Sequence, residues 1–476
     1  MSIVVVAVAW HVCMLPALAL GQPAKDEGGG ATPPGAPDGP TDWKFESLRL
    51  KDATVYHGLI LAEGETEIEF AEIFRPPGKP MFAVVRPVLP ESVEEITRLE
   101  GDERDDLVAR FQQLRNRVRI EAGRMQDVSL REDLRDGVQH WVAAREWFRL
   151  DSTADANMTR RCVVRVEQVF RAYRQLLPAR NDQTINLRLL LFGSLDEYRR
   201  FMHESGFRIA NPAFYSPSQN MIVAGSDLNG YARRLAQVRT HNEQARRQYK
   251  MLDSSFTDRL AGVLDEMRKR GYDDAEIEQE AKLRKAVWQR QYEAAVQEID
   301  LAERQNEAKF AEVTEQMFAR LYHEAFHAYV ENYVYPHRDG PMPRWLNEGL
   351  AQIFESGQLD GDTLRVDAPD RDRLRRLQVD LAGGDPLSVA DVLTAEENEF
   401  LANHEGDSAE RHYLYCWGFA YYLGYENNLL TRDALDQYVG NERNFGPRAR
   451  FIRMINMPLE KFDRLWRTAM LQLRPT

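Results

Sequence analysis

From residue 229 to residue 318 the chain is highly charged and almost free of glycine and proline. A segment of this composition has few places to turn, which restricts it to long helices. Apolar residues recur at helical spacing in two stripes, over 249–267 and 283–299. Between them, residues 270–273 supply a stop and a restart around Gly271. We therefore predict an inserted antiparallel helical hairpin over 229–318. Its composition leaves open a solvated structural insertion, a lid or a site for a protein partner.

The segments before this hairpin differ in composition. The N-terminal apolar run ends in Ala17-Leu18-Ala19, a cleavage pattern typical of a secretory signal, although no lysine or arginine precedes the run. We expect export to the periplasm or the extracellular space, or an N-terminal anchor if the signal is not cleaved. No later stretch is long and apolar enough to span a bilayer. The expected segments are a signal peptide (1–21), a flexible linker (22–42), a small β module (43–90), a helical connector (91–145) and an α/β unit (146–228).

Composition excludes several classes of function. The formal net charge of -13 argues against nucleic acid as the main partner, because phosphate binding normally needs a basic surface. Of the three cysteines, only Cys162 and Cys416 lie outside the expected leader. Two cysteines are too few for a disulfide framework or a cysteine-based metal site. A single bridge between them stays open, as does a propeptide role for residues 43–122.

One short motif carries the chemistry of the chain. His323 and His327 are four residues apart, so on a helix their imidazoles lie on one face, close enough to bind a single metal ion. Glu324 lies beside them and can take a proton from an activated water and pass it to a leaving amine. The alternative is a surface helix with two ordinary histidines.

A second segment argues against that alternative. Residues 344–354 have apolar positions at helical spacing, which leaves Glu348 free to face the first helix. A carboxylate from a second helix completes the two-histidine, one-glutamate set of a catalytic zinc, so we predict one zinc ion per chain. His337 is a weaker rival ligand, because it lies in an expected turn. These helices form the segment 319–358, and a helical subdomain should follow over 359–476.

The strings HEAFH (323–327) and WLNEGLAQ (345–352) together resemble the gluzincin, or peptidase MA-like, zinc metallopeptidases. The nearest resemblance is to exported bacterial proteins known only as a domain of unknown function. It covers residues 146–228 and 317 to about 430. It implies an α+β fold with a small mixed sheet, an active-site helix and a helical C-terminal subdomain. Tyr333 and Val330 occupy positions where a metzincin has histidine and glycine, which disfavours that clan.

The resemblance also implies further site residues. A tyrosine four residues before a tryptophan should stabilise the oxyanion, and Tyr413 before Trp417 fits that pattern, with Tyr415 and His412 as rivals. An edge strand over the cleft should pair with the substrate backbone. We predict that strand at Asn220, Met221, Ile222, Val223 and Ala224.

One position departs from the family pattern. Many gluzincins have an acidic residue four positions after the ligand glutamate, where it orients a zinc-bound histidine, but this chain has Gln352. An amide oxygen can accept the imidazole N–H, and Glu355, one turn further, can substitute. We expect metal binding to survive the departure, which leaves the catalytic efficiency open.

These residues predict an exported zinc metallopeptidase that acts on a peptide or protein, with Glu324 as general base and Tyr413 at the oxyanion. Two alternatives stay open. The chain can be a catalytically weak zinc-containing scaffold of the cell envelope, or a zinc amidase that acts on cell-wall peptide. Retention of Glu324 favours an enzyme, because a structural zinc needs no base.

Overall fold

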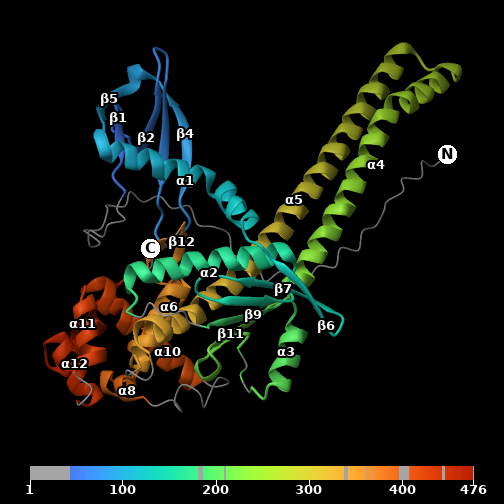
Figure 1. Cartoon of the computed structure of the whole chain (residues 1–476). Coiled ribbons are helices and arrows are strands. Elements are labelled where there is room, and N and C mark those ends of the chain that lie inside the picture. Colours follow the sequence, from blue (N-terminus) through green and yellow to red (C-terminus); the bar gives the residue numbers. More distant parts are fainter. Residues whose placement is uncertain are drawn as a thin grey trace.

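The computed structural model describes residues 43–180, 186–207, 209, 211–336, 341–361, 363–366, 368–395, 407–441 and 445–474. The expected signal peptide, the expected linker and His337 lie outside these residues. The described chain is an α+β protein, which confirms the predicted fold class. Figure 1 shows a body of helices around a mixed sheet, from which a β module and a long helical hairpin project. Within the described residues, every helix is too short or too polar to cross a membrane.

The β module is a five-stranded antiparallel sheet with one helix against it. The helix α1 (Gly101–Gln126) buries Leu107 and Phe111 against Leu59 and Ala71 of the sheet. The opposite face has its own small core around Phe70. The strand order is β4-β3-β2-β1-β5, with bounds β1 Glu46–Leu50, β2 Val55–Glu63, β3 Ile68–Phe74, β4 Phe82–Val88 and β5 Val93–Thr97.

The helical connector that we predicted over 91–145 is wrong outside α1. Val93 and Ile96 have helical spacing, but they lie in β5, which pairs with β1 and covers its buried Leu48. The same segment contains β6 (Arg131–Arg135) and β7 (Val138–Ala144). A turn at Asp136 (φ 50°) and Gly137 (φ 79°) joins these two strands, and the Asp-Gly pair is a hairpin signal. Tertiary pairing therefore outweighs the apparent helical period here.

The body is built on a six-stranded sheet with the order β10-β11-β9-β8-β7-β6. Pairing is parallel between β8 and β9 and between β9 and β11, and antiparallel elsewhere. The crossover helix α2 (Ala156–Leu176) covers the face that carries Leu189 and Leu191. The short helix α3 (Leu195–Glu204) covers the face that carries Leu190. The remaining strands are β8 Arg149–Ser152, β9 Arg188–Phe192, β10 Ala213–Ser216 and β11 Met221–Gly225.

The hairpin consists of α4 (Leu228–Lys269) and α5 (Asp274–Tyr329), and it extends away from the body in Figure 1. Asp273 caps the second helix in a capping box with Glu276. The two helices contact through a stacked pair, Phe256 and Trp288, whose ring centroids are 5.4 Å apart. The boundary that we expected after residue 318 falls inside α5. A single helix of 56 residues thus runs from the tip of the hairpin to both histidines of the motif.

The C-terminal part packs mainly helices around α6 (Arg344–Glu355). A Cβ at Gly349 would lie 2.3 Å from the carbonyl oxygen of Cys416, so α6 and α10 approach as closely as only glycine allows. Cys416 and Cys162 are both buried and free, so no bridge joins them. A small hairpin, β12 and β13, interrupts the expected helical subdomain. The described elements include β12 Gln358–Asp360, β13 Thr363–Arg365, α7 Arg371–Leu381, α8 Val389–Thr394, α10 Asp407–Tyr421, α11 Arg432–Asp436, α12 Pro447–Ile455 and α13 Leu459–Gln472.

Candidate metal centre

The predicted ligands converge where α5 packs against α6. Phe326 is buried on the side of α5 that faces away from the histidines. Its ring packs edge to face against Phe354 of α6, with ring centroids 4.8 Å apart. This packing turns His323 and His327 toward Glu348. One ligand atom from each of these three residues lies within 4.8 Å of the other two. Sequence spacing therefore predicted a cluster that the fold brings together.

The two separations that involve Glu348 fit a tetrahedral metal ion. Two donors that each lie about 2.1 Å from such an ion are about 3.4 Å apart. Oε2 of Glu348 lies 3.5 Å from Nε2 of His323 and 3.6 Å from Nε2 of His327. Two imidazole nitrogens and one carboxylate oxygen are also a donor set that zinc accepts. The residues present therefore fit the metal that the sequence predicts.

Both histidines are held by their other ring nitrogen. Nδ1 of His323 lies 3.5 Å from Oε2 of Glu355, and Nδ1 of His327 lies 3.1 Å from Oδ1 of Asn347. Acceptors at Nδ1 fix the ring and leave Nε2 for a metal. Glu355 is itself held by Arg373, 2.6 Å away. Glu355 thus takes the supporting position that we considered for it.

Gln352 does not support a histidine. Its Nε2 donates to the carbonyl oxygens of Tyr413, at 2.9 Å, and of Glu348, at 3.3 Å. These two bonds tie α6 to α10, and the supporting role that we had considered for either Gln352 or Glu355 falls to Glu355. The physical reason is the helix period: position 352 faces α10, whereas position 355 faces the histidines.

The charges of the cluster are strongly coupled. Burial alone would lower the pKa of His323, but Glu348, Glu355 and Glu324 outweigh it and raise that pKa to about 10. Burial alone would raise the pKa of Glu348, but the two histidines hold it well below its ordinary value. Burial raises the pKa of Glu324, although both histidines oppose that shift. The cluster therefore keeps the carboxylate of Glu348 ionised beside Glu324, whose pKa is elevated.

Glu324 makes a contact that the sequence did not reveal. Its Oε2 accepts a hydrogen bond of 2.8 Å from the backbone N–H of Tyr215 in β10. Every residue except proline has a backbone N–H, so the residue type at position 215 gives no indication of this hydrogen bond. The bond places the edge strand β10 directly against Glu324, the predicted base.

The predicted edge strand is one strand away from the observed edge. Met221, Ile222, Val223 and Ala224 lie in β11, which is paired on both sides, with β10 and with β9. Asn220 lies in the preceding turn with φ 44°. The edge is β10, whose Tyr215 reaches Glu324. All five residues of β11 are buried, and a fully apolar run such as MIVA is typical of an inner strand.

Tyr413 lies on α10 beside the metal ligands. Burial and the charge of Glu348 raise its pKa, and Arg344 opposes that shift. The guanidinium of Arg344 is 3.9 Å from Oε1 of Glu348, so Arg344 is a further charged group at the site that we had not predicted. The rival Tyr415 is fully buried and directs its hydroxyl to Asp380. His412 is half-buried on the same helix.

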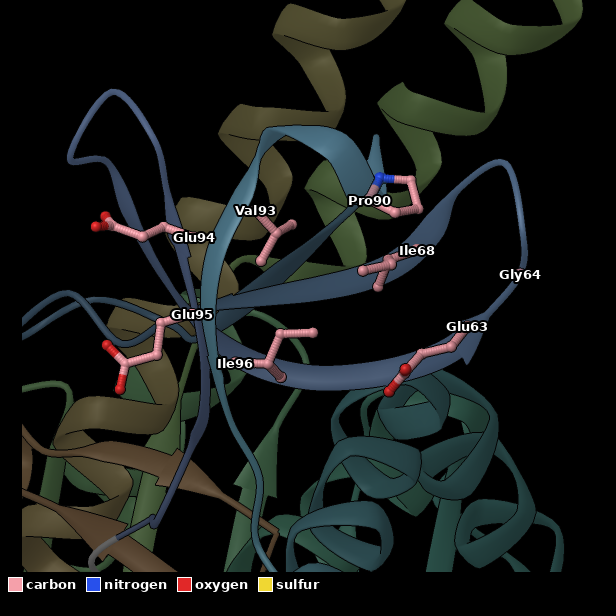
Figure 2. A pocket seen from close by; sticks show the side chains of 8 residues that line it. All are labelled: Glu63, Gly64, Ile68, Pro90, Val93, Glu94, Glu95 and Ile96. Atoms are coloured by element: carbon pink, nitrogen blue, oxygen red, sulfur yellow. The ribbon is translucent and has the colours of Figure 1, made fainter.

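A hollow of about 310 Å³ belongs to the β module and lies apart from these residues (Figure 2). Ile68, Val93 and Ile96 line it together with three glutamates. Two of these glutamates are paired: Glu63 with Arg98 at 2.8 Å, and Glu95 with Arg49 at 3.5 Å. None of the predicted site residues contributes to this hollow.

Comparison with known proteins covers the same region. Residues 317–440 match a family described as a protein of unknown function, DUF1570. The matched segment starts in the last turns of α5 and includes α6 and α10, so it contains every ligand of the cluster and Tyr413. It confirms the part of the resemblance that concerns a domain of unknown function. No curated protein matches the chain.

Proposed function

We propose that this protein is a zinc-dependent metallopeptidase in which His323, His327 and Glu348 hold the metal. The observation that carries the proposal is the convergence of these donors at separations that suit a tetrahedral ion, with the carboxylate of Glu324 beside them. A purely structural site needs no such carboxylate. Zinc bound there would supply Lewis acidity, which polarises a carbonyl and acidifies water.

Glu324 acts as the general base. The Tyr215 N–H holds Oε2, which leaves Oε1 to accept a proton from the attacking water. Once it holds that proton, the same carboxyl group can deliver it to the leaving nitrogen. The same side chain thereby serves both proton transfers of amide hydrolysis.

Tyr413 donates a hydrogen bond to the oxyanion that forms when water adds to the scissile carbonyl. Its raised pKa keeps the hydroxyl protonated, as a donor must be. Gln352 fixes the backbone of Tyr413 at 2.9 Å and so places the donor relative to α6. Removal of one oxyanion donor typically costs about 10²–10³ in kcat.

The substrate binds in an extended conformation along β10. The outer side of this strand is the edge of the sheet, and since Glu324 accepts its Tyr215 N–H, a peptide would pair with the other outward backbone groups of β10. A peptide that adds to a sheet edge forms main-chain hydrogen bonds that do not depend on its sequence. We therefore assign to β10 the role that we first gave to β11.

The proposal is tested by the hydrolysis of a mixed peptide library. We compare the wild type with Glu324→Gln, which keeps the shape of the base and removes its charge. Glu315→Gln is the matched control, because Glu315 is exposed on the same helix. The proposal requires cleavage by the wild type and the control, and loss of cleavage in Glu324→Gln with zinc retained. Zinc binding without cleavage of any library peptide would favour a scaffold or a non-protein amide instead.

A further inference from the structure

The active-site helix ends in an unusual turn. After α5 the chain forms a π-helical turn, Val330–Val334, in which the N–H of Tyr335 bonds the carbonyl of Val330 at 2.7 Å. Such a turn holds one extra residue and changes the direction in which side chains leave the helix. Asn332 lies at its centre, five residues beyond His327 and nine residues beyond His323. π-Turns inside helices are frequent at functional sites, so we followed the contacts of Asn332.

The side-chain amide of Asn332 connects the helix to the sheet. Its Nδ2 donates to Oδ1 of Asn220 at 2.8 Å and to the carbonyl of Ala328 at 2.8 Å, and it lies 3.4 Å from the hydroxyl of Tyr215. That hydroxyl donates to the same Oδ1 of Asn220 at 3.1 Å. Asn332, Asn220 and Tyr215 therefore contact one another through their side chains, and we call these three residues the asparagine clip.

The clip acts on the residue that holds the base. Tyr215 contributes its hydroxyl to the clip and its backbone N–H to Oε2 of Glu324. Both attachments reach β10 through Tyr215, one from Glu324 on α5 and one from Asn332 in the π-turn, eight residues further along. Two anchor points fix the distance and the tilt of a short edge strand, which a single bond cannot do.

We propose that Asn332 is a positioning residue that holds β10 against Glu324 and thereby fixes the orientation of the base carboxylate. The inference deepens the proposed function and rests on it for its catalytic meaning. The physical contact is independent of catalysis, so it can be tested separately. An asparagine suits the position because it donates through Nδ2 to Asn220, in the turn that follows β10, and to a helix carbonyl at once.

The first test is hydrogen–deuterium exchange of the full-length protein, followed in the peptides that cover β10 and β8. Asn332→Leu keeps the volume and removes the donor. We expect exchange in β10 to accelerate about tenfold or more while β8 stays unchanged, because only the edge strand loses an anchor. Asn332→Asp, which also lacks the donor, should act in the same direction if the leucine variant folds poorly. Tyr215→Phe should give a smaller acceleration, because the bond between Asn332 and Asn220 survives.

The matched control is Asn306→Leu. Asn306 is exposed on α5 and donates to the carbonyl of Ala302, four residues before it, at 2.7 Å. Asn332 makes the same kind of bond to Ala328, but Asn306 lies in the hairpin, outside the clip. It should leave exchange in β10 unchanged. Unaltered exchange in Asn332→Leu would overturn the proposal, and so would an equal acceleration in β8, which indicates a general structural role.

The catalytic readout separates this inference from the proposed function. With a cleaved peptide in hand, Asn332→Leu should lower kcat about tenfold more than Asn306→Leu, at unchanged zinc content. If the wild type cleaves no peptide, the proposed function fails while the exchange result still decides whether the clip exists. Faster exchange in β10 with unchanged kcat would overturn the positioning role.

Discussion

The carboxylate of Glu355 lies 3.5 Å from Nδ1 of His323 and is seven residues beyond the proposed ligand Glu348. Arg373 holds that carboxylate at 2.6 Å, and burial is outweighed by His323 and Arg373, so the pKa of Glu355 falls to about 2. The carboxylate therefore stays charged at neutral pH. Glu355 thus supplies a negative charge beside the outer ring nitrogen of His323, although position 352 carries an uncharged glutamine.

Glu355→Gln should weaken zinc binding about 10–100-fold, because supporting partners of ligand histidines typically contribute that much. Competition with a chelating indicator measures the affinity. Glu312→Gln, at an exposed position on α5, is the control and should bind zinc as the wild type does. Equal affinities for Glu355→Gln and the wild type would show that the contact with His323 has no influence on the metal.

Tyr413→Phe and Tyr415→Phe should affect different properties, the first kcat and the second stability. Loss of the Tyr413 hydroxyl should lower kcat about 10²–10³-fold with little change in stability. Loss of the Tyr415 hydroxyl removes its bonds to Asp380 and to the N–H of Leu387 and should cost about 1–3 kcal/mol of stability with kcat unchanged. Steady-state kinetics and urea unfolding of both variants check this pair. A normal kcat for Tyr413→Phe would remove this residue from the mechanism.

Gly349→Ala should destabilise the protein by about 2 kcal/mol or more, since the new Cβ would meet the Cys416 carbonyl at 2.3 Å and Cβ of Ala420 at 2.7 Å. Gly262→Ala in the interior of α4 should instead stabilise the helix by about 0.5–1 kcal/mol, because an added Cβ there meets nothing within 4 Å. Thermal unfolding followed by circular dichroism compares the two. If both variants unfold at the wild-type temperature, α6 and α10 do not pack as described.

Cys162 and Cys416 should resist alkylation in the folded protein. Burial raises the pKa of the Cys162 thiol to about 12 and that of Cys416 well above its ordinary value. The reactive thiolate is therefore scarce at pH 8 and becomes abundant only as the pH rises past the raised pKa. Iodoacetamide labelling followed by mass spectrometry should modify neither residue in buffer and both in denaturant. Rapid labelling of either one in the native state would contradict its burial.

The sequence was sufficient to predict the cluster of His323, His327 and Glu348, because much of its geometry is local. A spacing of four on a helix brings His323 and His327 together in any fold, and the apolar stripe around Glu348 shows which way the second helix faces. The long hairpin followed from composition in the same way. In each case a helical period alone determines the neighbours.

The sequence was insufficient where neighbours come from distant segments. Tyr215 meets Glu324 across 109 positions through a backbone N–H, which every residue but proline has. The choice between β10 and β11 as the edge depends on the pairing of β11 with β9. The apolar run of β11 indicated an inner strand, but the expectation taken from the family placed the edge there.

The zinc content of the purified protein tests the central claim most directly. Elemental analysis of the wild type and of Glu348→Ala, after dialysis against metal-free buffer, gives the ratio of zinc to chain. We predict about one zinc per chain in the wild type and a large loss in Glu348→Ala, because two histidines alone hold zinc weakly. A wild type without zinc, or a variant with as much zinc as the wild type, would contradict the assignment of His323, His327 and Glu348 as the metal site.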